Sequence, residues 1–239
     1  MIYSKMGLKK IILYHFNSFV DILFPRTCVV CGKVITAQEM YICTKCIYEL
    51  PRVNNCKIHN NPIYLQFFGR LQIENATSLF FYDKESGFAN LLYAIKYNGM
   101  KEFAELLGCR LGRVLKESLL YEDVDLIIPV PLHARKYKMR GYNQSEWIVR
   151  GIARVLGKDY SVNHLYRNEF TKTQTKKNRV ERWENVRNKF GIMMPDELQK
   201  KHILLVDDVL TTGATLEACG EILLKIEGVK LSIATLAKA

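Results

Sequence analysis

The segment that most constrains the fold lies at residues 202–215 and reads HILLVDDVLTTGAT. Residues 203–206 are a short apolar run of good strand formers, and residues 216–225 repeat apolar side chains at helical spacing. Two carboxylates, Asp207 and Asp208, stand between the run and the helix, followed by a hydroxyl-rich loop. The sequence therefore predicts a buried parallel strand that leads through a polar loop into a helix.

The polar loop has the chemistry of an anion site. It consists of Thr211, Thr212, Gly213, Ala214 and Thr215. The first N–H groups of a helix lack backbone partners and carry the positive end of the helix dipole, so they attract an anion. The threonine hydroxyls add hydrogen-bond donors, and the glycine allows the backbone to approach a ligand closely.

Asp207 and Asp208 cannot face a phosphate directly, because like charges repel each other. They can accept hydrogen bonds from two vicinal hydroxyls, or hold a divalent cation. A ligand with a phosphate at one end and a diol beside it satisfies both the loop and the carboxylates. A ribose 5-phosphate has this composition.

Three alternatives require other features. A nucleotide-binding P-loop needs the pattern G-x-x-x-x-G-K-[ST], and no lysine lies in this loop. A dinucleotide fold needs G-x-G-x-x-G, which is also missing from the segment. An ordinary acidic turn capped by Thr211 or Thr212 leaves two adjacent carboxylates that repel each other unless something binds them.

The chain has 239 residues, enough for one large or two unequal domains, and a formal net charge of +11. This charge favours polyanionic partners, namely phosphorylated substrates or nucleic acid. Residues 8–23 are apolar but interrupted by polar residues. We expect them to form an amphipathic helix packed on its own domain rather than on a membrane surface, and we expect no integral membrane span. Because no cleavage site follows, we expect a cytoplasmic protein.

Two C-x-x-C pairs, Cys28 with Cys31 and Cys43 with Cys46, are separated by eleven residues. Each pair can place two thiolates on one tetrahedral ion, and Gly32 permits the tight turn behind the first pair. Disulfides are the alternative, but a cytoplasmic chain sits in a reducing environment. The spacing therefore predicts a structural Zn²⁺ site with no open position for catalysis.

Cys56 and His59 form a further C-x-x-H pair, so six candidate ligands compete for four places. We expect the two C-x-x-C pairs to hold the metal, with Cys56 and His59 as substitutes. Cys109 and Cys219 lie in helical patterns, and we expect them to be small buried residues.

From residue 76 onward, predicted strands and helices alternate. The predicted strands are residues 78–82, 125–130, 203–206 and 230–236, and the predicted helices are residues 88–97, 102–115, 144–156 and 216–225. This order predicts an α/β fold, with a mostly parallel sheet covered by helices on both faces. A break at residues 60–62 divides the chain into an N-terminal helix and zinc-binding module (residues 1–65) and a larger domain (residues 66–239).

Residues 203–215 resemble the motif of type I phosphoribosyltransferases that binds 5-phosphoribosyl 1-pyrophosphate (PRPP): an apolar strand, two acidic residues and a T-T-G-x-T loop. The wider pattern is similar to the ComF (ComFC) family, which is associated with competence and DNA uptake. It includes AIKYNG at residues 94–99, PVPLH at residues 129–133 and RGYNQS at residues 140–145. The resemblance spans nearly the whole chain, and it implies a type I phosphoribosyltransferase-like domain behind a small zinc-ribbon-like module.

The resemblance implies a site for PRPP with Mg²⁺. In that site the loop of residues 211–215 holds the 5-phosphate. Asp207 and Asp208, the expected catalytic residues, hold the ribose hydroxyls. Arg135 and Arg140, which we expect in a short loop after Pro129 and Pro131, neutralise the pyrophosphate together with Mg²⁺, because guanidinium forks bind such oxygens bidentately.

Each of the basic residues also has a simpler interpretation. Lys96 is expected to reach a phosphate, although a lysine at the end of a helix is ordinarily only solvated. The segment with Arg135 and Arg140 can be a basic surface turn in which Asn143 caps the next helix. His133, in the same segment, can equally face solvent.

Residues 167–189 are polar and basic. They resemble the T-x-x-Q-T and R-x-x-N-V stretch of the family, in the region where phosphoribosyltransferases carry a mobile loop over the substrate. Lys177 stands where the family usually has leucine. Phe170, Trp183 and Phe190 lie among or beside the basic residues, a composition that also suits single-stranded DNA.

We therefore expect a PRPP-binding, phosphoribosyltransferase-like protein of the ComF family that acts in DNA uptake, as a transferase whose acceptor the sequence does not name. The alternative is a non-catalytic factor that binds single-stranded DNA, has a regulatory PRPP site and contacts DNA-uptake or recombination proteins. A PRPP-sensing repressor is disfavoured, because the sequence shows no helix-turn-helix segment.

Overall fold

The computed structural model describes residues 24–82, 87–168 and 189–239. The chain divides into two compact units, Met1–Leu50 and Pro51–Ala239. The units divide after Leu50, which is earlier in the chain than the domain boundary expected between residues 65 and 66. That domain boundary remains a prediction.

Two sequence-based expectations fall outside the described residues. They are the amphipathic helix at residues 8–23 and most of the basic segment at residues 167–189, with Lys177 and Trp183 in it.

Helices and strands alternate through most of the second unit, as the sequence predicts. The helices are α2 (Thr44–Glu49), α3 (Pro62–Leu65), α4 (Phe88–Tyr97), α5 (Lys101–Lys116), α6 (Ala134–Arg140), α7 (Gln144–Leu156) and α9 (Ala214–Leu223), with short 3-10 turns η1 (Leu119–Tyr121) and η2 (Pro195–Leu198). The strands are β1 (Asn75–Phe81), β2 (Leu126–Pro129), β3 (Asp159–Tyr160), β4 (Leu165–Arg167), β5 (Phe190–Ile192), β6 (His202–Leu210) and β7 (Lys230–Lys238).

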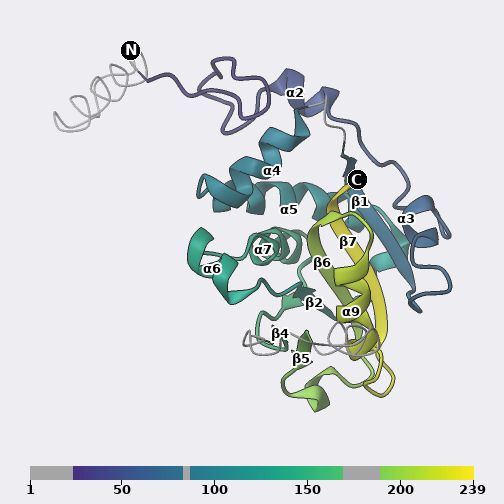
Figure 1. Cartoon of the computed structure of the whole chain (residues 1–239). Coiled ribbons are helices and arrows are strands. Elements are labelled where there is room, and N and C mark those ends of the chain that lie inside the picture. Colours follow the sequence, from purple (N-terminus) through teal and green to yellow (C-terminus); the bar gives the residue numbers. More distant parts are fainter. Residues whose placement is uncertain (1–23, 83–86, 169–188) are drawn as a thin grey trace, which may run out of the picture. The chain divides into compact units, whose positions relative to one another are not determined.

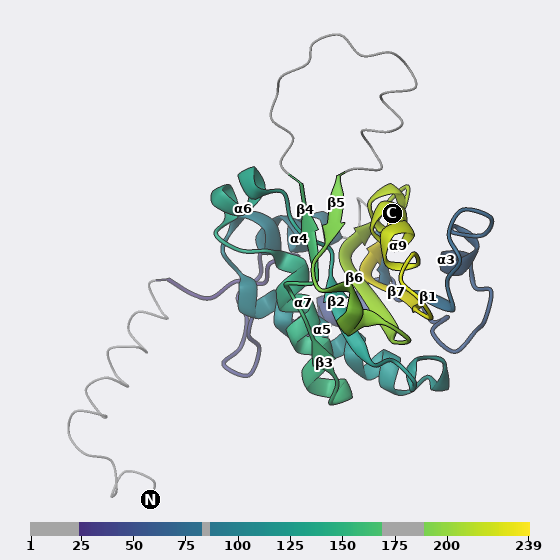
Figure 2. The ribbon, with the colours of Figure 1, turned by 90° about the horizontal axis from the view of Figure 1, so that it is seen from below.

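A five-stranded parallel sheet in the order β1-β7-β6-β2-β3 forms the centre of the second unit (Figures 1 and 2). β6 lies in the middle, between β7 and β2. Its residues 202–206 are all buried, which explains the apolar run in the sequence. The predicted parallel sheet is confirmed, and β4 and β5 form a separate antiparallel pair.

Helices cover both faces of this sheet. α5 and α7 lie against one face, and α9 lies against the other (Figures 1 and 2). On the α9 side, Ile203 and Leu205 of β6 share one apolar core with Leu216 and Leu223. The alternation of β6 residues between the two faces is the ordinary period of a strand.

Two glycines bring α5 and α7 into backbone contact. A Cβ atom on Gly108 would lie 2.1 Å from the carbonyl oxygen of Ile148, and one on Gly151 would lie 2.1 Å from that of Glu105. Any larger residue at either position would push the two helices apart. The contact therefore fixes the position of α7, whose first residues form part of the candidate site.

β6 extends further than the sequence predicts. The apolar run predicts an end at Val206, whereas the strand continues through the acidic pair to Leu210. The partner strand β7 is long enough to pair with Asp207, Val209 and Leu210, so the ladder is maintained beyond the apolar run.

The segment with the two arginines is the helix α6 rather than the loop expected after two prolines. Its start is capped by His133, whose Nδ1 accepts a hydrogen bond from the backbone N–H of Arg135 at 3.1 Å. It ends at Gly141, which has a φ of 78°. The loop prediction was wrong because both prolines precede the cap. The predicted cap of the next helix is confirmed, since the Asn143 side chain accepts from the N–H of Ser145 at 3.1 Å.

Among residues 24–82, 87–168 and 189–239, no helix has both the length and the apolar character needed to span a membrane.

Candidate functional site

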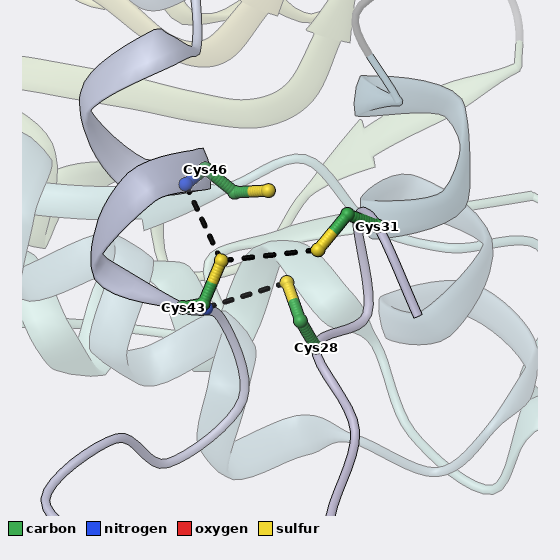
Figure 3. Close-up of side chains that lie close together, drawn as sticks. All are labelled: Cys28, Cys31, Cys43 and Cys46. Carbon is green, nitrogen blue, oxygen red and sulfur yellow. Dashed lines mark hydrogen bonds between the residues drawn. The ribbon is translucent and has the colours of Figure 1, made fainter. Parts of the chain in front are cut away.

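The four cysteines of the two C-x-x-C pairs gather in the first unit. Figure 3 shows Cys28 and Cys31 pointing toward Cys43 and Cys46. All four sulfur atoms lie within 4.8 Å of one another. The first pair lies on a turn that needs a φ of 73° at Gly32, and the second pair lies at the start of α2.

The cluster fits a tetrahedral Zn²⁺ ion. The Sγ atoms of Cys31 and Cys43 are 3.8 Å apart. Zn–S bonds of about 2.3 Å in a tetrahedron separate two sulfurs by about 3.8 Å. Four thiolates complete the coordination, so the cluster supports a structural zinc site.

The backbone around Cys28 favours the thiolate form that a metal needs. Burial raises the pKa of this thiol, but hydrogen bonds from the backbone N–H groups of Cys43, Cys31 and Val30 outweigh burial and lower the pKa to about 7. The N–H of Cys43 lies 3.3 Å from the Cys28 sulfur. The fold therefore prepares one ligand for the ion before the ion arrives.

The other cysteines lie outside this cluster. Cys56 is buried in the second unit, where burial raises the pKa of its thiol to about 11, and His59 is exposed. The group of four sulfurs contains neither residue. Cys109 and Cys219 are buried, as the sequence predicts.

The two carboxylates of β6 are each held through one oxygen. Oδ1 of Asp207 accepts hydrogen bonds from the Ser145 hydroxyl at 2.9 Å and from the N–H of Asp208 at 2.8 Å. Oδ2 of Asp208 lies 2.8 Å from Nζ of Lys96 and accepts a hydrogen bond from Nε2 of Gln144 at 3.0 Å. Asp208 is only 6% exposed, so this ion pair is largely withdrawn from solvent.

One helix end reaches both carboxylates. Consecutive strand residues point to opposite faces of a sheet, yet Asp207 and Asp208 are bound by consecutive residues, Ser145 and Gln144, at the start of α7. The remaining oxygens, Oδ2 of Asp207 and Oδ1 of Asp208, accept no hydrogen bond from the described residues. Each carboxylate therefore keeps one acceptor for a ligand.

The pKa of Asp207 is raised to about 7. Burial is the main cause, and the charge of Asp208 adds to it. Hydrogen bonds from the Asp208 N–H and the Ser145 hydroxyl offset only part of the rise. The carboxylate is therefore poised near neutral pH, so that a ligand or a cation can decide its charge.

The structure connects one of the two predicted arginines to the carboxylates. Nη1 of Arg140 donates to Oε1 of Gln144 at 2.9 Å, and the guanidinium lies 5.1 Å from the centre of the Tyr97 ring. Gln144 in turn binds Asp208. Arg135 is exposed on α6, and its side chain forms no ion pair or hydrogen bond with the described residues.

In the loop after β6, Thr211 and Thr212 are exposed, whereas Gly213 is buried. The carbonyls of Thr211 and Thr212 accept hydrogen bonds from the side chains of Gln66 and Arg70. The N–H groups of Thr211, Thr212 and Gly213 donate to no described residue. Gly213 has a φ of 82°, which a residue with a side chain rarely adopts. The two carbonyls are thus paired, whereas the three N–H groups have no partner among the described residues.

The start of α9 completes the loop. Ala214 and Thr215 are exposed in the first turn of the helix, and Gly213 is its N-terminal cap. Thr212 Oγ1 accepts a weak hydrogen bond from the N–H of Ala214 at 3.4 Å, but the cap of α9 is Gly213 rather than Thr211 or Thr212 of the acidic-turn alternative. The remaining donors of the first turn are open to an anion.

The sequence analysis assigned no role to Gln144 and Ser145, although both lie in the RGYNQS pattern. A usable signal was the Asn143 cap that precedes them. The Asn143 amide donates to the carbonyl of Val130 at 3.0 Å, which ties the start of α7 to the end of β2. Polar residues next to a cap at a strand end are good candidates for a site.

Two domain families match this chain. Residues 19–64 match the Double zinc ribbon domain, and residues 145–239 match the Phosphoribosyl transferase domain. The DNA utilization protein YhgH of Escherichia coli O157:H7 is 30% identical over 142 residues, which cover 56% of this chain and 60% of that protein. Competence protein F of Haemophilus influenzae is 33% identical over 116 residues, which cover 48% of this chain and 51% of that protein.

The zinc-ribbon and phosphoribosyltransferase matches occur in the order that the sequence motifs predict, and the relatives include a competence protein F. Together these findings support a ComF-family protein. The type I phosphoribosyltransferase-like sheet and the zinc-ribbon-like module of this chain are thereby confirmed. The solved purine phosphoribosyltransferase from Pyrococcus horikoshii aligns with 56% of this chain and 73% of its own chain, at 24% identity and a TM-score of 0.37.

Proposed function

We propose that this ComF-family chain binds PRPP with Mg²⁺ at the carboxyl edge of its sheet and acts in DNA uptake. The observation that carries the proposal is the combination of backbone amides at residues 211–213, which have no partner among the described residues, with two carboxylates that each keep one acceptor oxygen. The role in DNA uptake is supported by the names of the relatives, a DNA utilization protein and a competence protein.

Each part of PRPP has a matching group. The 5-phosphate fits the N–H groups and hydroxyls of residues 211–215. The two ribose hydroxyls fit the unpaired oxygens of Asp207 and Asp208. The pyrophosphate fits Arg140, and Arg135 on the exposed side of α6 extends the positive surface.

The donor set also fits Mg²⁺. This ion prefers oxygen ligands and is commonly held by one or two carboxylates together with substrate phosphates. Asp207 and Asp208 would supply the carboxylates, and the substrate and water would supply the remaining oxygens. When bound, the ion would neutralise the charge of the pyrophosphate, which assists its departure.

Transfer breaks the bond between ribose C1 and the pyrophosphate oxygen and forms a bond from C1 to a nucleophile. The chain's own residues would hold the ribose, orient C1 and balance the charge of the leaving group, and such positioning supplies much of the rate. A transferase would move the phosphoribosyl group to an acceptor, whereas a protein that only binds PRPP would not turn it over.

Calorimetry with PRPP and Mg²⁺ tests the binding site. We expect Asp207→Asn/Asp208→Asn to lower the affinity by about a hundredfold or more, because two charged acceptors are lost, while zinc content is unchanged. The control Asp196→Asn/Glu197→Gln removes the same number of charges from exposed residues and should bind as the wild type does. Equal affinity of both double variants would contradict the proposal.

A second candidate function, binding of single-stranded DNA, is favoured by α6. None of its residues is buried, and it carries four cations, at positions 135, 136, 138 and 140. Beside it lies a cleft of about 420 Å³, lined by Tyr137 and Lys138 of α6 and by Tyr166 and Arg167 of β4. Aromatic rings beside cations suit bases and phosphates of a single strand.

Fluorescence anisotropy with a labelled single-stranded oligonucleotide tests the second function. We expect Lys136→Gln/Lys138→Gln to weaken binding and to reduce the slope of log affinity against log salt by about 1–2. Lys225→Gln/Lys230→Gln is the control, since both lysines are exposed on other elements. A pyrophosphate-release assay with and without the oligonucleotide then shows whether DNA is an acceptor. Wild-type binding that does not depend on salt would exclude this surface.

A further inference from the structure

Gln144 lies between the two ends of the proposed ligand. Its side chain is 5% exposed and uses both functional atoms. Oε1 accepts from Nη1 of Arg140 at 2.9 Å, and Nε2 donates to Oδ2 of Asp208 at 3.0 Å. Arg140 faces the proposed pyrophosphate, and Asp208 faces the proposed ribose.

The chemistry of the neighbours fixes the orientation of this amide. A guanidinium only donates hydrogen bonds, and a carboxylate only accepts them. The amide oxygen must therefore face Arg140, and the amide nitrogen must face Asp208. A rotation of the amide group would break both hydrogen bonds at once, so a change in the position of Arg140 affects the position of Asp208.

Neighbouring side chains reinforce this arrangement. Lys96 holds the same carboxylate oxygen of Asp208 as Gln144 does, at 2.8 Å. Tyr97, the next residue of α4, lies under the guanidinium of Arg140. The Nε atom of Arg140 is buried without a hydrogen-bond partner among the described residues. The bond from Nη1 of Arg140 to Gln144 is therefore a main anchor of the guanidinium.

Resting on the PRPP-binding function proposed above, we propose that Gln144 is a positioning residue that couples the pyrophosphate end of the site to the ribose end. Arg140 orients the Gln144 amide, and the amide orients Asp208 for the ribose hydroxyls. Arg140 thus contributes to ribose binding even when the ligand has no pyrophosphate.

Ribose 5-phosphate separates this coupling from direct contact, because it contains the ribose and the phosphate but no pyrophosphate. Affinities for ribose 5-phosphate are measured by calorimetry for the wild type, Arg140→Met, Gln144→Leu and the double variant. We expect Arg140→Met to weaken binding about fivefold in the wild-type chain and less than about twofold in the Gln144→Leu chain. Removing the Arg140 cation also lowers the affinity through long-range electrostatics. This effect is the same in both backgrounds and therefore cancels when the two fold-changes are compared.

Two further variants keep the test valid if Gln144→Leu is unstable. Gln144→Glu has nearly the same size and still accepts from Arg140, but it cannot donate to Asp208, so we expect weaker ribose 5-phosphate binding. Gln199→Leu is the control, because Gln199 is exposed and its side chain bonds only to Asp196 among the described residues. Zinc content and the thermal midpoint identify any variant that fails to fold.

The outcomes distinguish the two proposals. An equal effect of Arg140→Met in both backgrounds, with a wild type that binds PRPP and ribose 5-phosphate, overturns the coupling and leaves the binding site intact. A wild type that binds neither ligand overturns the proposed function and the coupling with it. A smaller effect in the Gln144→Leu background supports the coupling, which a purely structural role of Gln144 would not produce.

Discussion

The zinc cluster and the proposed ligand site are built in opposite ways. All four sulfurs of the cluster come from one short stretch, residues 28–46, and a turn and a helix start bring them together. The ligand site takes residues from α4, from the α6–α7 region and from the β6–α9 junction. Local spacing is therefore enough to assemble the zinc cluster, which we call the local region. The proposed ligand site, which we call the assembled region, exists only when the sheet and its helices are in place.

The largest expected effect concerns the local region. Cys43→Ser should abolish zinc binding, because three remaining thiolates leave the ion without a full set of ligands. Zinc content of the purified chain measures this directly. Affinity for PRPP should stay within about twofold of the wild type if the ligand site is assembled by the second unit alone.

Cys56→Ser is the matched control for this prediction. Cys56 lies outside the four-sulfur group, so its substitution should leave zinc content at the wild-type level. Complete loss of zinc in Cys56→Ser would show that the ligand set differs from the observed cluster.

Sequence reasoning predicted the local region almost fully and the assembled region only in part. The two C-x-x-C pairs were sufficient to predict the cluster, because cysteine spacing along the chain nearly determines sulfur positions. The apolar run of β6 predicted a buried strand, and the parallel sheet followed from the alternation of elements.

The missing parts of the assembled region depend on contacts between distant residues. Neither the ion pair of Lys96 with Asp208 nor the amide of Gln144 between Arg140 and Asp208 leaves a periodic signal in the sequence. The helix α6 was missed for a different, local reason. Its cap is a histidine, which is not among the residues that commonly start helices.

The second prediction tests whether the assembled region depends on one long-range ion pair. Lys96→Met should lower PRPP affinity about tenfold, because Asp208 loses its charged partner in a largely buried place. Arg135→Met should have a smaller effect, since Arg135 is exposed and its side chain forms no ion pair or hydrogen bond with the described residues. Calorimetry on both variants ranks them, and the reverse order would show that PRPP binding does not depend on the ion pair of Lys96 with Asp208.

The third prediction concerns the pH dependence of the assembled region. The pKa of Asp207 is raised from 3.8 to about 7, first by burial and then by Asp208. The unfolded chain therefore releases this proton at a lower pH, and the free energy of unfolding falls as the pH rises from about 4 to about 7. Asp207→Asn should remove this fall, which amounts to about 1–3 kcal/mol in the free energy of unfolding.

Denaturant unfolding at about pH 5 and about pH 8 measures that difference. Asp196→Asn is the control, because Asp196 is exposed. If the wild type and Asp207→Asn lose stability equally between these two pH values, Asp207 is charged throughout and the poised carboxylate is refuted.

The smallest expected effect returns to the local region. Glu39 accepts hydrogen bonds from the backbone N–H groups of Thr36 and Thr44, which with the hydroxyl of Thr44 lower its pKa to about 2. Because the pKa is depressed, this stabilisation is present above the ordinary value of 4.5 and is lost as the pH falls toward about 2. Glu39→Gln should lower zinc affinity a few-fold at neutral pH, since the carboxylate ties the loop to the start of α2.

Competition with a chromophoric chelator measures this zinc affinity. Glu49→Gln is the matched control, because Glu49 is exposed and its side chain forms only a 3.6 Å ion pair with Lys45 among the described residues. An equal change in the two variants would mean that Glu39 contributes general charge rather than a specific anchor.

The most direct test of a sugar-phosphate site at this sheet edge is a crystal structure of the chain with ribose 5-phosphate. We predict the phosphate on the N–H groups of residues 211–213 and the ribose hydroxyls on Oδ2 of Asp207 and Oδ1 of Asp208. A ligand bound elsewhere, or a β6–α9 corner filled by side chains with both carboxylates turned away from it, would contradict this assignment.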